Sequence, residues 1–563
     1  MIGSSRTPRR RVAVLLLVCA LAGSAALRVA GGADKQGFTH DESISVLAAA
    51  CHQGDYTRVT AAAQPPFGRW APASDWKALM RPDQAFCLGE IGRDLARGDI
   101  HPPLYFWVLH GWTLAFGVGL WTGVSLNIAL AALTGVALFG LARRLFGDPL
   151  KAAAVAAVWS FSPAAIRVFA EARQYELVAL LAVLFVWQCV RFCYPPTRSP
   201  RRDALGLAAL AAAGALAQFL FGLVVVAGAV VLSLRLWPSR RGLLAWGLAS
   251  IGAGYAVFSL VHPEFVLSLR RARAQAAEGA AVLLPGRVEA TIDTLAEFLV
   301  PPVLARGWVA PAAAVLFIAL TALAIWQASR ALARRRGAAG DPQPEEEHDG
   351  ARVSPVAMVL VFAGLAATHA VLFLTFLSPS GAMGFKHLSV VWPFAAFVPV
   401  LAIGALPRRA RLPAGAAGGA LLAAAGAVAA LGQYPPRGAA PPLERADAVL
   451  IDNVARGVLP RIVWRLPDDT RVFAADQRHL LTHKRDWVTR LERGDVVVQR
   501  LPASDPRYGN SPGLGRRVGA AIAARHRLRS LPDPLEPRSV FDLQDPLRSV
   551  GVSPRKGPNP ARL

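Results

Sequence analysis

Apolar blocks of about 15 to 20 residues recur along this chain, close to the length of helix that crosses a bilayer. The first block runs from Val12 to Ala30 and follows the basic segment RTPRRR. Of the 563 residues, 54% are hydrophobic and 17% are charged, and the mean hydropathy is +0.38. We therefore expect a polytopic α-helical membrane protein.

The charge balance is strongly basic, with 61 Lys and Arg against 37 Asp and Glu and a formal net charge of +24. On a soluble protein this excess would suggest nucleic acid as a partner. Here much of it lies in short loops between apolar blocks, where it indicates membrane topology and attraction to anionic lipid. We expect no nucleic-acid partner.

Basic loops on one side of the membrane orient the spans. The first block resembles a signal peptide, but its apolar run is long, which favours an uncleaved span with the amino terminus inside. Placing every basic cluster inside gives about eleven crossings and an external carboxyl end. The further expected spans are Val124 to Leu141, Ala152 to Ser162, Leu177 to Cys193, Ala204 to Gln218, Phe221 to Leu234, Leu243 to Val261, Val309 to Trp326, Val356 to Phe376, Leu388 to Ile403 and Ala414 to Leu431.

One apolar segment, Pro102 to Gly117, does not fit this alternation as a crossing. It is short for a span, begins with two prolines and is rich in aromatic residues that favour interfaces. We expect it to lie as a helix at the outer surface of the bilayer. The preceding loop, residues 31–101, is then external.

Acidic residues at the start of that loop raise the question of function. The segment GFTHDESIS holds two carboxylates, Asp41 and Glu42, next to His40 and close to the first apolar block. A pair of acids at a membrane boundary is typical of a site rather than of lipid-facing structure.

A second acidic cluster lies in RVFAEARQYEL, on the same expected face. If this segment is a continuous helix, Arg167, Glu171 and Tyr175 share one stripe, while Arg173 and Glu176 form a neighbouring pair. One interpretation is that these charges pair with each other and anchor a helix end. The other is that they belong to the same site as the first cluster.

Two of the five cysteines, Cys51 and Cys87, lie in the external loop, whereas Cys19, Cys189 and Cys193 lie in or at the ends of spans. On an oxidising face, two cysteines in one loop suggest a disulfide. Two unpaired buried thiols remain the alternative.

The order of these motifs carries a resemblance. HDE after the first span, then HPPLYFWVLHGWTLAFG, ARRLFGD and SPAAIRVFAEARQYEL resembles the GT-C class of membrane glycosyltransferases, which use polyprenyl-phosphate sugars. The group that transfers mannose to proteins and aminoarabinose to lipid A is the most similar. The later segment GFKHLSVVWPFAAFVPVL resembles the basic motif of the family before a late span.

The resemblance implies roles for individual residues. It makes Asp41 the general base on the acceptor hydroxyl and Glu42 and Glu171 the accompanying acids. It places three basic residues at the lipid phosphate: Arg173, Lys386 and His387. It suggests His40, His101, Tyr105 and Tyr175 as substrate contacts, although His101 is equally consistent with a helix cap or an interface role.

The chemistry of sugar transfer independently requires these residue types. Breaking the anomeric C–O bond of a lipid-phosphate sugar passes through an oxocarbenium-like state, which needs a carboxylate base and cations at the departing phosphate. We therefore expect an inverting transfer to a lipid, glycan or protein acceptor at the external (periplasmic) face of the cytoplasmic membrane. Relatives differ in their use of a divalent metal ion, and no ligand spacing here predicts a metal site.

The last part of the chain changes character. Residues 1–432 read as the transmembrane domain, and residues 433–563 alternate helix and strand patterns, which predicts a small external α/β domain with a parallel sheet and a loose tail.

Two other functional classes would have a similar hydropathy pattern. A flippase or transporter would show acids within its spans. A polysaccharide polymerase or ligase would place basic residues in a late external loop, as SLRRARAQ does here.

Overall fold

The computed structural model of the whole chain describes most of its residues. The described ranges are 6–168, 170–193, 199–238, 240–278, 284–337, 364, 385–434, 442–492, 495–498, 511–530 and 540–546. Apart from Gly364, the expected span Val356 to Phe376 lies outside the described residues, as does the loose carboxyl-terminal tail.

Contacts divide the chain into two compact units. The first comprises Met1–Lys35 and Pro82–Pro435, and the second comprises Gln36–Arg81 and Pro436–Leu563. The sequence predicted a division near residue 432, and the contacts differ by also assigning Gln36–Arg81 of the acidic loop to the second unit.

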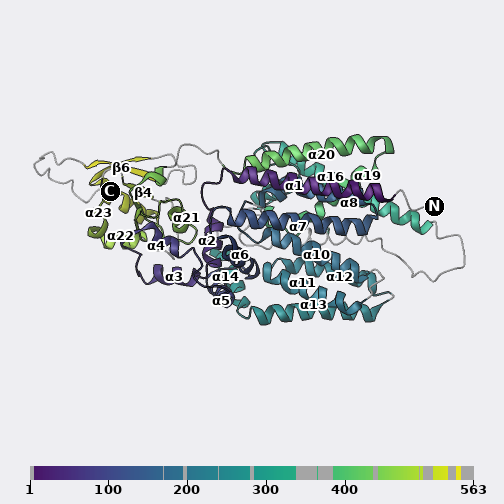
Figure 1. Cartoon of the computed structure of the whole chain (residues 1–563), viewed down its shortest axis with the longest axis horizontal. Coiled ribbons are helices and arrows are strands. Elements are labelled where there is room, and N and C mark those ends of the chain that lie inside the picture. Colours follow the sequence, from purple (N-terminus) through teal and green to yellow (C-terminus); the bar gives the residue numbers. More distant parts are fainter. Residues whose placement is uncertain are drawn as a thin grey trace, which may run out of the picture. The chain divides into compact units, whose positions relative to one another are not determined.

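The first unit is helical in its described part, and Figure 1 shows its long helices running side by side. Helix α1 packs against α7, α8 and α20, and α10 packs against α7, α11 and α12. The helices are α1 (Arg6–Gly32), α5 (Leu88–Gly98), α6 (Leu104–Phe116), α7 (Trp121–Phe146), α8 (Pro149–Phe161), α9 (Pro163–Val168), α10 (Tyr175–Cys193), α11 (Pro200–Ala217), α12 (Phe221–Leu236), α13 (Arg241–Val261), α14 (Phe265–Glu278), α15 (Leu284–Ala296), α16 (Val309–Gly337), η3 (Phe385–Leu388), α18 (Trp392–Ala395), α19 (Phe397–Ala405) and α20 (Arg408–Leu431).

Six of the described helices are long and apolar enough to cross a membrane: α1, α7, α10, α13, α16 and α20. Helices α6, α8 and α12 and the segment Trp392–Ala405 are apolar but shorter. The expectation of a polytopic helical membrane protein is confirmed. The count of about eleven crossings stays a prediction, as does the interfacial position of α6.

Local sequence explains where several of these helices begin. Asp148 caps α8, because its carboxylate accepts a hydrogen bond from the amide of Leu150, and proline occupies the first helical position. Ser199 caps α11 in the same way, with Pro200 following it. These caps set the residues at which α8 and α11 begin.

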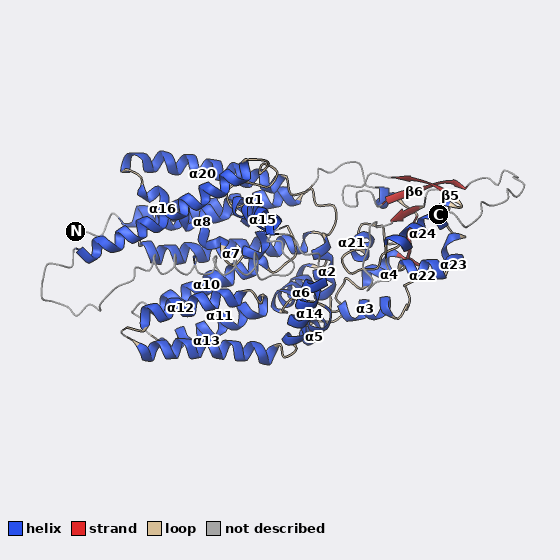
Figure 2. Ribbon diagram, turned by 180° about the vertical axis from the view of Figure 1, so that it is seen from behind, coloured by secondary structure: helices blue, strands red, loops and turns tan. Residues whose placement is uncertain are grey.

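The second unit contains all the described strands, drawn red in Figure 2, and they form one six-stranded sheet. Its spatial order is β1-β3-β2-β4-β6-β5. The elements are α2 (His40–Ala49), α3 (Gln53–Ala61), β1 (Trp70–Pro72), α4 (Ala73–Ala78), η4 (Pro442–Arg445), β2 (Ala448–Ile451), α21 (Leu459–Val463), β3 (Arg471–Ala474), α22 (Gln477–Thr482), α23 (Lys484–Val488), β4 (Val496–Val498), α24 (Pro512–Ala523), β5 (His526–Ser530) and β6 (Val540–Pro546).

The sheet is mixed, whereas the sequence predicted a parallel one. Strands β3, β2 and β4 pair in parallel, but β6 and β5 add antiparallel strands at one edge and β1 does so at the other. Strand β1 comes from the amino-terminal loop. It is fixed by Trp70, whose ring lies 5.5 Å from that of Phe473, and by Lys77, which donates to Asp468 across 2.6 Å. That ion pair lowers the pKa of Asp468.

Candidate functional site

The two adjacent acids of the first cluster have different environments on α2. Glu42 is 1% exposed, and its carboxylate accepts a hydrogen bond from the amide of Thr39 at 2.9 Å. The Thr39 hydroxyl accepts one from the amide of Glu42 at 3.3 Å, which completes a capping box. Asp41 is only half-buried and lies outside this pair of bonds. Glu42 is thus the acid that starts the helix, and Asp41 has no part in the capping box.

Contacts with the carboxyl-terminal part of the second unit hold α2 in place. The Ser43 hydroxyl donates to the carbonyl of Arg456 at 3.3 Å. The imidazole of His40 lies where a side chain at Gly457 would be, so a larger residue there would displace the ring. The segment before α21 therefore packs against the start of α2.

The second cluster does not form the continuous helix that its spacing suggested. Helix α9 ends at Val168 and α10 begins at Tyr175, so the expected stripe is broken. Arg167 instead forms an ion pair of 2.7 Å with Glu297. Burial raises the pKa of that glutamate, partly offset by Arg167. The interpretation in which Arg167 and Glu171 share a helix face is wrong.

Side chains of two neighbouring helices hold the turn that carries Glu171. Asn127 of α7 donates from Nδ2 to the Glu171 carbonyl at 2.5 Å, and the hydroxyl of Tyr105 on α6 lies 3.3 Å from the Asn127 Oδ1. Both Tyr105 and Asn127 are fully buried. Tyr105 thus supports the turn through Asn127.

The same turn buries a cation. Arg173 is 3% exposed, and its neighbours Ala172 and Gln174 are each 1% exposed. Ala172 lies against Gly123 at the start of α7, so closely that any side chain at Gly123 would collide with it. Close packing thus fixes the position of Arg173, two residues before α10 begins. A cation that binds an anionic group needs such a fixed position.

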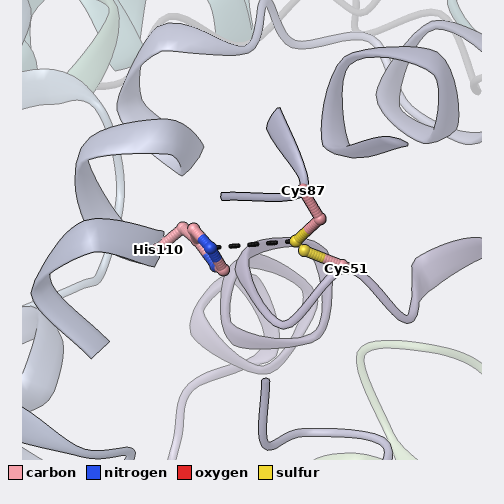
Figure 3. Close-up of side chains that lie close together, drawn as sticks. All are labelled: Cys51, Cys87 and His110. Carbon is pink, nitrogen blue, oxygen red and sulfur yellow. Dashed lines mark hydrogen bonds between the residues drawn. The ribbon is translucent and has the colours of Figure 1, made fainter. Parts of the chain in front are cut away.

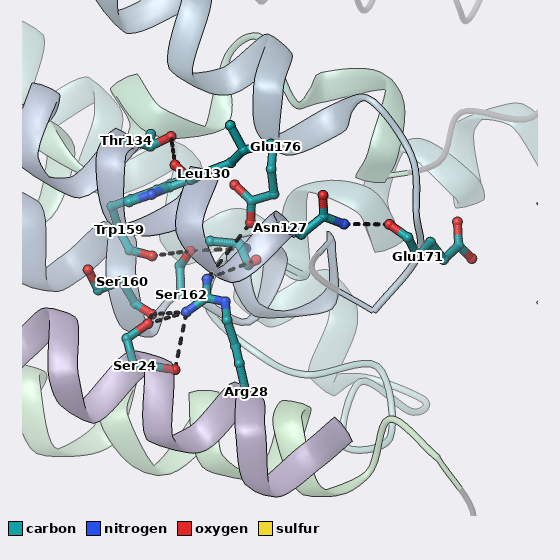
Figure 4. Close-up of polar contacts among 11 residues, drawn as sticks. Ser24, Arg28, Asn127, Leu130, Thr134, Trp159, Ser160, Ser162, Glu171 and Glu176 are labelled. Atoms are coloured by element: carbon teal, nitrogen blue, oxygen red, sulfur yellow. Dashed lines mark hydrogen bonds and ion pairs between the residues drawn. The ribbon is translucent and has the colours of Figure 1, made fainter. Parts of the chain in front are cut away.

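A buried ion pair that the sequence analysis did not predict lies beside this turn (Figure 4). Arg28 of α1 and Glu176 of α10 are 2% and 0% exposed, with 3.9 Å between their charged groups. Arg28 also donates to the carbonyls of Ser24, Ser160 and Ala165. Within the described part of the chain, neither oxygen of Glu176 has a hydrogen-bond partner. The expected Arg173–Glu176 pair is replaced by this one.

His101 also has an acidic partner. Its Nδ1 lies 2.6 Å from Oδ1 of Asp99, which is 8% exposed and accepts a further bond from the amide of Ile100. The carboxylate fixes the orientation of the imidazole through Nδ1.

The remaining predicted residues lie in the first unit. Tyr175 is 6% exposed at the first position of α10. Lys386 is half-buried in η3, and the side chain of His387 lies outside the described residues. The structure thus brings Tyr105, Glu171 and Arg173 together in one unit, and His40, Asp41 and Glu42 together in the other.

Cys51 and Cys87 are disulfide-bonded, and Cys19, Cys189 and Cys193 are free. Figure 3 shows the sulfur atoms of Cys51 and Cys87 beside His110, whose Nε2 lies 3.7 Å from the sulfur of Cys87. Among the described residues, these three make the one group of His, Cys, Asp and Glu with metal-ligand spacing. Metal binding by cysteine needs thiolates, so the bonded pair does not supply ligands.

We compared the chain with protein families and with solved structures. A family model described as dolichyl-phosphate-mannose-protein mannosyltransferase matches residues 100–266. The crystal structure of ArnT from Cupriavidus metallidurans bound to undecaprenyl phosphate is similar with a TM-score of 0.53 and 15% identity, covering 94% of this chain and 97% of that chain. This chain has the GT-C fold of membrane glycosyltransferases. The apo structure of the same ArnT gives a TM-score of 0.51 and 14% identity over the same shares. No curated protein sequence matches the chain.

The resemblance to GT-C enzymes expected from the motifs is confirmed. Sequence reasoning missed three polar residues: Arg28 and Asn127, which lie beside the turn, and Asp99, which contacts His101. A usable signal existed for Arg28, because a charge inside an apolar span is rare and generally has a partner. Asn127 carried a weaker signal of the same kind, as a single amide within α7.

Proposed function

We propose that this protein transfers a sugar from a polyprenyl-phosphate-linked donor to an acceptor hydroxyl at the external face of the cytoplasmic membrane. Its GT-C fold supports the reaction class, and the similar ArnT structure is one bound to undecaprenyl phosphate. The observation that carries the proposal is the turn between α9 and α10. It holds a buried arginine, Arg173, beside the acid Glu171 at the end of a membrane-length helix.

The proposed mechanism assigns each residue type a task. Asp41 removes the proton of the acceptor hydroxyl as it attacks the anomeric carbon from the face opposite the phosphate, which gives inversion. Arg173, with Lys386 and His387, stabilises the negative charge that develops on the departing polyprenyl phosphate. Glu171 stands on the acceptor side.

Other residues act by positioning these groups. Glu42 begins α2 and thereby orients Asp41, since its carboxylate is used in the capping box. Tyr105 supports the Glu171 turn through Asn127. His40, His101 and Tyr175 remain proposed contacts of the sugar or acceptor, and no residue set is assigned to a metal ion.

Transfer from a panel of radiolabelled polyprenyl-phosphate hexoses and pentoses tests the proposal. The purified protein in lipid nanodiscs should release sugar from at least one donor to an envelope lipid, glycan or peptide fraction. Arg173→Ala should weaken donor binding as well as the single-turnover rate, because a phosphate contact acts in both the ground state and the transition state.

Arg97→Ala is the matched control, since it removes an arginine that is 67% exposed from the same unit. It should retain donor binding and rate. Translocation of intact labelled donor across vesicles, with no sugar cleaved from any of them, would replace the proposal with transport.

A further inference from the structure

A second basic cluster surrounds a cavity at the far end of the helices that carry the proposed site. The cavity has a volume of about 850 Å³. It lies where α7 and α10 end and α11 begins. Four arginines line it: Arg143, Arg144, Arg191 and Arg202.

The cavity lining also contains one carboxylate, Asp203, which contacts one of the arginines. Asp203 of α11 has a side chain that is 5% exposed and pairs with Arg191 at 3.1 Å. Gln188 of α10 donates to its carboxylate at 3.0 Å and to its backbone carbonyl at 2.9 Å. Asp203 therefore offsets one arginine and ties α10 to α11. The lining keeps an excess of positive charge.

An apolar wall completes the cavity. Trp187 lies directly on Gly140 of α7, where any side chain would collide with its indole. Val136 and Phe139 extend this wall along α7. A pocket with a cationic rim and an aromatic and aliphatic side suits an amphipathic ligand that carries an anionic group.

The cavity is separate from the proposed active site. Helix α10 has 19 residues, begins beside the Glu171 turn and ends at the cavity. At about 1.5 Å per residue, the two sites are roughly 28 Å apart, close to the thickness of the hydrocarbon core. The cavity thus lies at the end that carries the basic loops, which the topology assigns to the cytoplasmic leaflet.

The geometry points to a phosphate-binding site in this cavity, for the headgroup of an anionic lipid or for a soluble phosphate ester. Guanidinium groups bind phosphate oxygens through paired hydrogen bonds, and the four cavity arginines are exposed and so accessible to such a ligand. Within the described residues, no carboxylate forms an ion pair with Arg143 or Arg202, so both guanidinium groups have capacity for an anion.

Topology signals alone do not explain this arrangement. Arginines that only orient a span need no shared cavity. Here arginines from three helix ends line one space, and a buried Asp203 with Gln188 holds the helices that form it. Such fixed walls are characteristic of a binding site.

Binding measurements on the full-length protein test the site without an activity assay. Native mass spectrometry in neutral detergent would compare phosphatidylglycerol with phosphatidylcholine of the same acyl chains, and calorimetry would probe inorganic pyrophosphate. Removing two cations with Arg143→Gln/Arg202→Gln should weaken binding of the phosphate ligand by roughly 30-fold. The charge-retaining Arg143→Lys/Arg202→Lys protein should keep a larger part of it.

The matched control is Arg201→Gln/Arg409→Gln, which removes the same charge from two arginines that are exposed, as Arg143 and Arg202 are, but lie outside the cavity lining. It should bind within about twofold of the wild type. Selective loss of phosphatidylglycerol in the cavity variant identifies a lipid ligand, and selective loss of pyrophosphate identifies a soluble one. Equal binding by the cavity variant and the wild type, or equal loss in the control, would overturn the proposal.

Discussion

Replacing Glu42 with alanine should destabilise the start of α2, whereas Asp41→Asn should leave it intact. The 2.9 Å bond from the Thr39 amide ends on the carboxylate of Glu42, which is 1% exposed. Alanine would leave that amide without its acceptor. The loss of such a cap costs about 1 kcal/mol, rising to about 3 kcal/mol if the donor stays buried. Local opening of α2 should therefore increase roughly 5- to 150-fold.

Substitutions of Asp41 and Glu42 should also have different effects on the rate of sugar transfer. Asp41→Asn preserves size and the capping box but removes the proposed base, so single-turnover transfer should fall by about two to four orders of magnitude. Glu42→Gln keeps an acceptor for the Thr39 amide, since glutamine also completes capping boxes. Its rate and its α2 stability should remain within a few-fold of the wild type.

Hydrogen exchange of the α2 amides, measured beside transfer of radiolabelled sugar, checks both effects in one preparation. Asp55→Asn is the control for loss of a carboxylate, because Asp55 on α3 is paired with the exposed Arg58. If Glu42→Gln abolishes turnover with unchanged exchange, Glu42 is a chemical participant and the division of roles fails. Wild-type turnover in a folded Asp41→Asn protein would falsify the assignment of the base.

Three further predictions address topology, redox state and packing. A reporter fused at Arg144 should read cytoplasmic; an external reading would make α6 a crossing and shift the span count. Non-reducing peptide maps of protein from its native envelope should join Cys51 to Cys87, and free thiols at both would contradict this. Glu176→Gln should lower the free energy of unfolding by about 3–5 kcal/mol, since it removes a buried carboxylate that pairs with the buried Arg28. Adding Arg28→Met should recover part of that loss in a denaturant titration, and purely additive losses would show that the two residues are not coupled.

Local patterns predicted the helical part of the fold well. The expected spans at Val124 to Leu141 and Leu177 to Cys193 coincide with α7 and α10 to within a few residues. Hydropathy was sufficient there because a bilayer selects for length and apolarity, which are properties of the segment itself. The mixed sheet escaped prediction, since β1 joins it from the amino-terminal loop, far away in sequence.

In the candidate site, too, local patterns predicted some features and missed others. The ordered motifs identified Asp41, Glu171 and Arg173 as residues of interest, because acids and cations near a membrane are costly and therefore informative. They did not reveal that Glu42 caps its own helix, although Thr39 three residues before it offered the signature.

The sequence by itself determined that this chain is a polytopic membrane protein with the motif order of GT-C enzymes, since those properties reside in composition, block length and residue order. Only the tertiary structure decided the partners of the buried charges. Glu176 has a nearby arginine, Arg173, in the sequence, yet it pairs with Arg28 from another helix. Helix packing determines which cation reaches a buried carboxylate, and the periodicity of one segment holds no information about the helix that will pack against it.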